Sequence, residues 1–341
     1  MASLDKSTVE NLLKSFIDPH LGTDLIAAKS VKNITIENNT VSLQIQLGYP
    51  AKSYINSLKQ QLQSLIQKLE GAEQVDIDVS VQISAHAVQK TLKPLSKVKN
   101  IIAIASGKGG VGKSTTTVNL ALALAAEGAK VGILDADIYG PSIPTMLGLQ
   151  GKPETEDGKF FIPKTSFGIQ TISIGYLVDP DQAVIWRGPM ATGALQQLLT
   201  QTLWDDLDYL MIDLPPGTGD IQLTLAQQIP VSGAVIVTTP QDIALIDAQR
   251  GLAMFEKVNV PILGLIENMS LHICSNCGHE EAIFGQGGGV DMAERNQVEL
   301  LGSLPLDKSI REFADQGRPT LVADSEGRPA LIYREIARKM A

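Results

Sequence analysis

The stretch Gly107-Lys-Gly-Gly-Val-Gly-Lys-Ser114 decides the fold of the larger part of this chain. The apolar run Ile101–Ala105 comes directly before it, and a helix-prone segment from Thr115 to Glu127 follows. A strand, a glycine-rich loop and a helix in this order are the context that G-x-x-x-x-G-K-[ST] needs before it indicates a phosphate-binding loop. Glycines let consecutive backbone N–H groups turn towards an anion, and the helix adds a positive dipole end. We therefore predict a nucleotide-binding loop here.

Each residue of this loop has an expected role. Lys113 is expected to reach the β- and γ-phosphates of ATP, and the Ser114 hydroxyl to bind Mg²⁺. A simple turn has no use for the cation of Lys108 directly after its first glycine. The remaining residues expected around the nucleotide are Gly107, Gly109, Gly110, Val111, Gly112 and Thr115.

The spelling KGGVGKS resembles the deviant Walker A loop of P-loop ATPases of the ParA/MinD class. In that class the extra lysine crosses a dimer interface to the partner's nucleotide. The resemblance implies that Lys108 and Lys113 are catalytic residues, and that the chain forms a homodimer with ATP sandwiched between its subunits.

The composition is that of an ordinary globular protein of about two domains. The chain has 341 residues, 44% of them hydrophobic and 19% charged, with a formal net charge of −9. This charge disfavours a dominant nucleic-acid surface, because neutralising phosphates needs clustered Lys and Arg. The sequence has neither a continuous hydrophobic leader nor the roughly 18 apolar residues of a spanning helix. We therefore expect a soluble, cytoplasmic protein with no nucleic-acid or membrane partner.

Residues 1–84 read as a separate small α+β module. Apolar spacing predicts helices over Lys6–Phe16 and Ser53–Leu69. Strict alternation predicts a hairpin with its turn at Glu37–Thr40, and a further strand over Val75–Ile83. The predicted order of elements is α-β-β-α-β.

The segment Asp18–Ile26 and its surroundings resemble the small accessory domain of iron–sulfur assembly factors. Cysteine is absent from this module, so a thiolate role is excluded, and partner docking or regulation is the expected role. Residues 85–98 are rich in lysine without an apolar period and are predicted to form an exposed linker. Residues 99–341 are predicted to form the ATPase domain.

Short apolar runs alternate with helical patterns from Ile101 onward. Runs of this kind are typical of strands buried on both faces of a mainly parallel sheet. We therefore predict an α/β fold, a mainly parallel-sheet P-loop NTPase domain preceded by a small α+β domain. The predicted strands are Ile101–Ala105, Val131–Leu134, Ile169–Ile174, Tyr209–Ile212, Ala234–Val237, Ile262–Ile266 and Leu300–Leu304.

Two acidic motifs follow predicted strands, where parallel sheets bind their ligands. In Asp135-Ala-Asp137 the two carboxylates can face one crevice, although an Asp-rich turn is the alternative. The resemblance to the ATPase class implies that Asp137 orients the attacking water and that Asp135 lies near the metal. Asp213 fits a Walker B element that holds Mg²⁺ through water, and the amide of Gly217 is expected to bond the γ-phosphate as a switch.

Two further segments resemble parts of the same class. Asn268, in Glu267-Asn-Met-Ser270, stands where the class reads adenine, and a strand-ending asparagine is an equally good explanation. Trp186-Arg-Gly-Pro-Met190 also resembles a family segment, with no derivable role beyond shaping a loop. The predicted chemistry does not need the scattered histidines His20, His86, His272 and His279.

The only two thiols of the chain, Cys274 and Cys277, form a C-x-x-C motif. A thiolate pair supplies half of a four-cysteine site for an iron–sulfur cluster or for zinc. Because the chain has no second pair, a symmetric dimer would complete the site, with the metal on or near its axis.

A redox role, a one-chain zinc site and a structural role compete with this interpretation of the cysteines. A redox C-x-x-C opens a helix, whereas Gly278–Glu281 reads as a turn. A one-chain zinc site with His272 and His279 would crowd four ligands into eight residues. A structural thiol pair has nothing to pack against in an exposed loop. Zinc held between two chains stays open.

GKGGVGKS, DADIYGPS, DLPPGTGD, ENMS and the C-x-x-C together resemble the Mrp/ApbC family of iron–sulfur cluster carrier ATPases, over residues 98–341. The resemblance implies a homodimer that assembles a labile [4Fe-4S] cluster between two Cys274/Cys277 pairs. Such a dimer takes the cluster from donor scaffolds, passes it to apo iron–sulfur proteins, and slowly hydrolyses ATP with Mg²⁺ as a conformational switch.

Two alternatives remain from the sequence. A ParA/MinD-type positioning ATPase shares the loop and depends on a carboxy-terminal membrane helix or a basic DNA surface. The segment Leu331–Met340 could be misread as such an anchor, but a core stripe of Leu331, Ile332 and Ile336 is the commoner explanation. The other alternative is a zinc-bridged dimer that only binds nucleotide.

Overall fold

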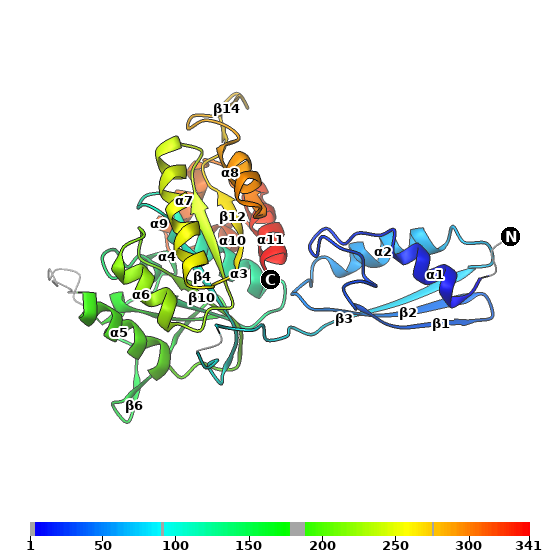
Figure 1. Cartoon of the computed structure of the whole chain (residues 1–341), viewed down its shortest axis with the longest axis horizontal. Coiled ribbons are helices and arrows are strands. Elements are labelled where there is room, and N and C mark those ends of the chain that lie inside the picture. Colours follow the sequence, from blue (N-terminus) through cyan, green and yellow to red (C-terminus); the bar gives the residue numbers. More distant parts are fainter. Residues whose placement is uncertain (1–3, 90–91, 178–187, 275) are drawn as a thin grey trace. The chain divides into compact units, whose positions relative to one another are not determined.

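The computed structural model describes residues 4–89, 92–177, 188–274 and 276–341 (Figure 1). The chain divides into two compact units. The first comprises the residues up to Ser84 with Ala126–Gly128 and Ala341, and the second comprises Ala85–Ala125 and Ala129–Met340. Within the described ranges, every helix is too short or too polar to cross a bilayer.

The first unit has the predicted α-β-β-α-β order. Its elements are α1 (Lys6–Leu13), β1 (Val31–Glu37), β2 (Thr40–Leu47), α2 (Ile55–Ile66) and β3 (Gln74–Val81). Strands β1 and β2 form the predicted antiparallel hairpin, and β3 pairs with β2 in parallel. Both helices are shorter than predicted, because Phe16 and Leu69 lie beyond their last helical turns and α2 begins at Ile55 rather than Ser53.

The core of the first unit follows from alternation along β2. Every second residue from Val41 to Leu47 is buried, and these side chains form one cluster with the stripe of α2. That stripe consists of Leu58, Leu62 and Ile66, all fully buried. The apolar face of the strand, which repeats every two residues, therefore packs against the apolar face of the helix, which repeats about every 3.6 residues.

The second unit is built on an eight-stranded sheet with the order β15-β12-β11-β4-β10-β5-β9-β8. All its neighbouring pairs are parallel except the edge pair of β8 and β9. The predicted strands all form, which confirms the mainly parallel fold. Their bounds are β4 (Val98–Ala105), β5 (Val131–Asp135), β8 (Lys164–Ser166), β9 (Ile169–Ser173), β10 (Leu207–Asp213), β11 (Gly233–Thr238), β12 (Ile262–Glu267) and β15 (Leu300–Ser303).

Helices lie against this sheet in the order expected of alternating strands and helices (Figure 1). The first of them, α3, begins directly at the end of the glycine-rich loop. Their bounds are α3 (Lys113–Ala126), α4 (Ile143–Met146), α5 (Gly188–Gln201), α6 (Asp220–Gln228), α7 (Asp242–Lys257), α8 (Gly288–Asn296), α9 (Lys308–Asp315), α10 (Thr320–Ala323) and α11 (Arg328–Met340).

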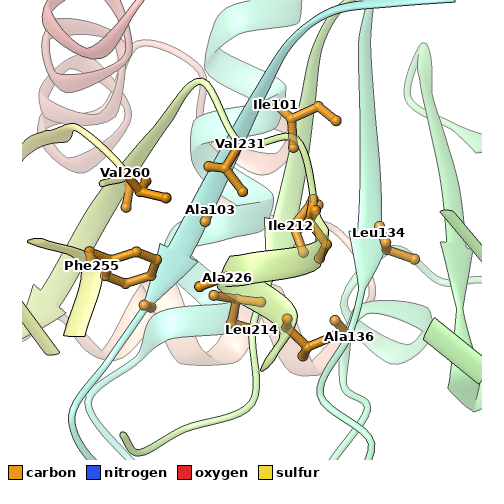
Figure 2. Packing of buried hydrophobic residues seen from close by; sticks show 14 of the residues in the cluster. Ile101, Ala103, Leu134, Ala136, Ile212, Leu214, Ala226, Val231, Phe255 and Val260 are labelled. Carbon is orange, nitrogen blue, oxygen red and sulfur yellow. The ribbon is translucent and has the colours of Figure 1, made fainter. Parts of the chain in front are cut away.

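The central strands are fixed by apolar packing near the site. Figure 2 shows Ile101 and Ala103 of β4 and Ile212 of β10 among residues of the covering helices, such as Phe255 of α7. Phe255 and Ile212 are fully buried. Burying one such side chain contributes about 1.5–3 kcal/mol, so the strand ends that carry the polar motifs are held on a rigid platform.

Several short elements differ from the sequence predictions. The pairs β6 (Thr155–Glu156) with β7 (Phe160–Phe161), and β13 (His272–Ile273) with β14 (Glu280–Glu281), were not predicted, and neither was the three-residue edge strand β8. Two-residue strands are too short to show a period, which is why alternation does not reveal them. Strand β4 begins at Val98, the last residue of the predicted linker.

The predicted core stripe of the last helix is wrong in part. Leu331 is 47% exposed, whereas Tyr333 and Ile336 are 1% exposed. The buried face of α11 also takes in Ala337 and Met340. Positions 333, 336, 337 and 340 repeat at helical spacing, and Leu331 lies off that face.

Candidate functional site

The polar motifs converge at the carboxyl ends of three adjacent strands. Strand β10 lies between β4 and β5, so the loop after β4 and the acids that end β5 and β10 are neighbours. Asp213 and Asp135 stand directly opposite each other in the register of β10 and β5. The structure therefore brings together the glycine-rich loop and both acidic motifs.

The loop after β4 accepts only glycine at critical positions. Gly112 has a φ of +84°, and a Cβ atom there would lie 2.2 Å from Nδ2 of Asn268. A Cβ atom on Gly107 would lie 2.1 Å from the backbone carbon of Asp247 in α7. Helix α3 then starts at Lys113, so its free N–H groups face the loop. This arrangement suits an anion.

Lys113 is the buried cation of the site, with 5% of its side chain exposed. Its Nζ lies 2.8 Å from Oδ1 of Asp213 and 3.5 Å from Oδ2 of Asp137. The same nitrogen donates to the Ser114 hydroxyl over 3.2 Å. The ammonium group is therefore held among carboxylates at the mouth of the loop.

Asp213 collects hydroxyl donors from α3. The Ser114 hydroxyl donates to Asp213 Oδ2 over 2.5 Å, and the Thr117 hydroxyl donates to Oδ1 over 2.8 Å. Carboxylate and hydroxyl oxygens are hard ligands of the kind that Mg²⁺ prefers. The residues at this point therefore fit a magnesium ion.

Asp135 is fully buried beneath these groups. Ser173, at the end of β9, donates its hydroxyl to Asp135 Oδ2 over 2.8 Å, and the amide of Asp137 donates to Oδ1 over 3.1 Å. Burial, and next the charge of Asp213, raise the pKa of Asp135 from 3.8 to about 8. Burial also raises the pKa of Asp137. Two carboxylates, Asp137 and Asp213, share the ammonium group of Lys113 above the buried Asp135, so the site favours added positive charge.

Gly217 and Lys108 were both predicted to contact the nucleotide. In the structure the Gly217 amide is already hydrogen-bonded, whereas the Lys108 ammonium group is not bonded to any residue that the structure describes. The Gly217 amide, at a φ of +103°, donates to the Ser106 carbonyl over 2.9 Å. A bond from this amide to a γ-phosphate would require Gly217 to leave Ser106. The Lys108 side chain is partly exposed, and its ammonium group makes no hydrogen bond or ion pair with the described residues.

A pocket of about 420 Å³ opens beside the loop. Asn268 lies on its wall and donates Nδ2 to the Val111 carbonyl over 2.8 Å, while its Oδ1 accepts the amide of Met269. Asn268 therefore ties the end of β12 to the loop. The other lining residues include Gly112, Thr115, Pro141, Thr145, Leu306, Asp307 and Arg311.

The C-x-x-C motif lies at the tip of the hairpin formed by β13 and β14, which we call the cysteine hairpin (His272–Glu281). The Cys274 amide donates to the His279 carbonyl over 2.9 Å, and the Gly278 amide to the Cys274 carbonyl over 2.8 Å. Both cysteines are free, Cys274 partly exposed and Cys277 exposed. The motif does not open a helix, in agreement with the sequence, although Glu280 and Glu281 form β14 rather than a turn.

The environment of Cys274 favours its thiolate. Hydrogen bonds from the backbone of Asn276 and of Cys277 lower the pKa of Cys274, and the Cys277 side chain adds to the effect. Among the described residues, His, Cys, Asp and Glu side chains nowhere gather in threes to hold a metal. The one-chain zinc site with His272 and His279 is therefore not formed in this part of the chain.

Some residues of the site had no motif to reveal them. Thr117 could have been found from its helical spacing of four from Lys113. Ser173 meets Asp135 only because β9 pairs with β5. Glu267 accepts the Gly289 amide over 2.6 Å at the start of α8. Trp186 and the arginine after it lie outside the described residues.

Comparisons with known proteins agree with this geometry. The sequence model of the ParA family described as NUBPL iron-transfer P-loop NTPase matches residues 97–341, and that of an iron–sulfur cluster assembly protein matches residues 6–79. The iron–sulfur cluster carrier protein of Salmonella typhimurium is 53% identical over 337 residues, which are 98% of this chain and 91% of that protein.

Solved structures share the fold of the second unit. The nucleotide-binding protein of Archaeoglobus fulgidus in complex with ADP is 39% identical with a TM-score of 0.60, over 68% of this chain and 91% of that one. The cell division ATPase MinD of Pyrococcus furiosus, at 23% identity and a TM-score of 0.54, covers 71% of this chain and 98% of its own, and shows the fold alone. With a family match across most of its length, and a relative more than half identical over nearly all of it, this chain belongs to the NUBPL iron-transfer family of ParA-type P-loop NTPases.

Proposed function

We propose that this protein is an ATP-hydrolysing iron–sulfur cluster carrier that works as a homodimer in the cytoplasm. The observation that carries the proposal is the position of the only two thiols. They lie on a hairpin that follows β12, the strand whose end contacts the nucleotide loop through Asn268. A cargo site and a nucleotide site therefore extend from one strand end.

The cargo is a [4Fe-4S] cluster bound by Cys274 and Cys277 of each of two subunits. One chain supplies two of the four thiolates that a cubane cluster needs, so a second copy supplies the others. The lowered pKa of Cys274 increases its thiolate fraction, and the thiolate is the form that binds metal. Partial exposure of the hairpin lets a recipient protein reach the cluster.

The nucleotide is held by the loop after β4. Backbone amides from Gly107 to Thr115 surround the phosphates, and Lys113 turns from the carboxylates towards the β- and γ-phosphates. Ser114 and Asp213 would hold Mg²⁺, which would neutralise charge on the phosphates. The adenine base fills the pocket beside Asn268.

Hydrolysis needs mainly positioning and neutralised charge. Asp137 orients the attacking water, and Asp135 lies near the metal. Lys108 has no polar partner among the described residues of its own chain, which supports a role on the partner's nucleotide. The Gly217 amide exchanges the Ser106 carbonyl for the γ-phosphate and thereby acts as the switch.

Partners follow from the cargo. The carrier receives clusters from donor scaffolds and passes them to apo iron–sulfur proteins. The first unit matches an iron–sulfur cluster assembly family and has no cysteine, so docking of such partners is the role that suits it.

Anaerobic reconstitution with iron and sulfide tests this function. Wild-type protein is expected to bind about four irons and four sulfides per dimer, with visible absorption, because two cysteine pairs match one cubane. The double variant Cys274→Ala/Cys277→Ala is expected to bind no cluster and to keep its affinity for Mg·ADP. The matched control is His279→Asn, which changes an exposed side chain of the same hairpin and should load normally. Zinc bound by wild type in preference to iron would instead favour the zinc-bridged dimer.

A further inference from the structure

One short segment contacts both the pocket and the cysteine hairpin. Pro305, Leu306 and Asp307 line the pocket, and we call Leu304–Asp307 the pocket segment. The chain entering the hairpin runs beside it. The Ser270 amide donates to the Leu304 carbonyl over 3.0 Å, and the Leu306 amide donates to the Leu271 carbonyl over 2.9 Å. The base of the hairpin is therefore bonded to the wall of the pocket.

His272 adds a side-chain bond to this contact. Its Nδ1 lies 3.0 Å from the Leu306 carbonyl oxygen, and a β-bridge joins the same two residues. A carbonyl oxygen can only accept, so Nδ1 carries the hydrogen in this bond. His272 stands two residues before Cys274. A shift of Leu306 would therefore act on the strand that leads to the first thiol.

A ligand in the pocket would contact the pocket segment directly and could therefore shift it. Asp307 accepts the Ser309 amide over 2.7 Å at the start of α9, so segment and helix form one unit. That helix contributes Ile310 and Arg311 to the pocket wall. A base that fills the pocket thus contacts the segment, its helix, and the asparagine that is bonded to the nucleotide loop.

We propose that His272 is a positioning residue that couples occupancy of the pocket to the geometry of the cysteine pair. This inference rests on the proposed function, because it takes the pocket as the site of the nucleotide base and the thiols as the site of the cluster. Coupling between two sites is reciprocal, so the cluster must change nucleotide affinity by the same factor as the nucleotide changes cluster affinity.

Two substitutions separate this bond from the bulk of the ring. His272→Asn places an amide nitrogen close to where imidazole has Nδ1, so the bond to Leu306 is retained. His272→Gln carries its amide one methylene further, near the place of Nε2, and loses the bond. The control is again His279→Asn, whose side chain is exposed in the same hairpin.

The first measurement is the dissociation constant of Mg·ADP for apo and for cluster-loaded protein, by calorimetry. In wild type the two constants should differ by a factor of about 5 or more, the lower end of typical allosteric coupling. His272→Asn and the control should keep this ratio. His272→Gln should bring it close to one, while its apo dissociation constant stays within about twofold of wild type.

The second measurement needs no cluster. Mg·ADP added to apo wild type should slow amide hydrogen exchange in the cysteine hairpin, and it should do so in His272→Asn but not in His272→Gln. A purely structural histidine would change hairpin exchange equally with and without nucleotide.

Each remaining outcome has a definite meaning. A ratio of one in wild type that binds both ligands overturns the coupling and leaves the proposed function intact. A wild-type ratio in His272→Gln assigns the coupling elsewhere and also overturns the inference. Wild type that fails to bind either Mg·ADP or the cluster overturns the proposed function, and the inference with it.

Discussion

Among single residues, Asp135 shows most clearly what burial does to the chemistry of the site. Its carboxyl group is fully buried, faces Asp213, and accepts the Ser173 hydroxyl. Removing a carboxylate from water disfavours its charged form, and a second carboxylate nearby disfavours it further. The group therefore takes up a proton in the folded protein at pH values where it would be ionised in the unfolded chain.

This residue gives the protein a predictable pH dependence. The pKa of Asp135 is about 8 in the folded chain, against 3.8 for the ordinary carboxyl group. Between these values the native state binds more protons, so the stabilising contribution is full below about pH 4 and is lost as pH rises through about 8. Asp135→Asn cannot titrate. Without nucleotide, the thermal midpoint of the variant minus that of wild type should therefore increase as the pH is raised from 5 to 9.

The control for this series is Asp205→Asn, which changes an exposed aspartate and should follow wild type at every pH. If Asp135→Asn also follows wild type across the range, Asp135 does not titrate there.

The two loop lysines are expected to fail differently when removed. Lys113 lies among the carboxylates of its own chain, whereas the Lys108 ammonium has no polar partner among the described residues. Both Lys113→Ala and Lys108→Ala should abolish ATP hydrolysis. Lys113→Ala should also weaken Mg·ADP binding at least about tenfold, since charge-assisted bonds are worth about 1.5–3 kcal/mol.

Lys108→Ala should leave Mg·ADP binding to the monomer unchanged. Equal weakening in both variants would contradict a role of Lys108 on the partner's nucleotide.

Site residues that belong to recognisable sequence motifs were predictable, whereas site residues that are brought in by strand pairing were not. The loop, Asp135 and Asp213 follow apolar runs that predict strands, so their shared place at one sheet edge was predictable. Ser173 reaches Asp135 only because β9 pairs with β5. The order of strands across a parallel sheet cannot be predicted from the local sequence of each strand.

At the scale of elements, the end of β12 is attached on two sides. Asn268 donates to the loop after β4, and the neighbouring Glu267 accepts the Gly289 amide of α8 over 2.6 Å. A carboxylate at a helix amino-terminus satisfies a free N–H group and favours the helix dipole. Strand β12 therefore connects the nucleotide loop with the helix that follows the cysteine hairpin.

Removing this carboxylate should loosen α8. Glu267→Ala leaves the Gly289 amide without its acceptor, and the expected loss of stability is about 1–2 kcal/mol, the range for a helix cap. Urea unfolding measures the loss. Glu294→Ala, at an exposed position on the same helix, is the control and should change stability by less than about 0.5 kcal/mol. A loss no larger than that of the control would show that Glu267 does not hold the helix.

The elements themselves were predictable where the apolar pattern was long. Short, mainly apolar segments indicated every strand of the large sheet except the edge strand β8, and the alternation in β2 indicated the first hairpin. Leu331 was expected in the core of α11 because its apolar side chain suggested burial, yet the helix leaves it 47% exposed. The two-residue strands around the cysteines follow from backbone pairing, which leaves no trace in hydrophobicity.

At the scale of the whole molecule, one chain has fewer cysteine ligands than a four-thiolate metal site needs. It has two cysteines, and among its described residues no third His, Cys, Asp or Glu side chain is gathered with them as a metal site. Its nucleotide loop likewise contains one lysine that the described residues of its own chain do not engage. Both observations are explained if two subunits meet across the nucleotide and the cysteine hairpins.

Native mass spectrometry of the anaerobically reconstituted wild-type protein shows directly whether two subunits share the cluster. We predict that the cluster mass, about four irons and four sulfides, is found on the dimer and that the monomer is free of metal. A monomer that carries the cluster, or any metal at full stoichiometry, would contradict a site shared between subunits.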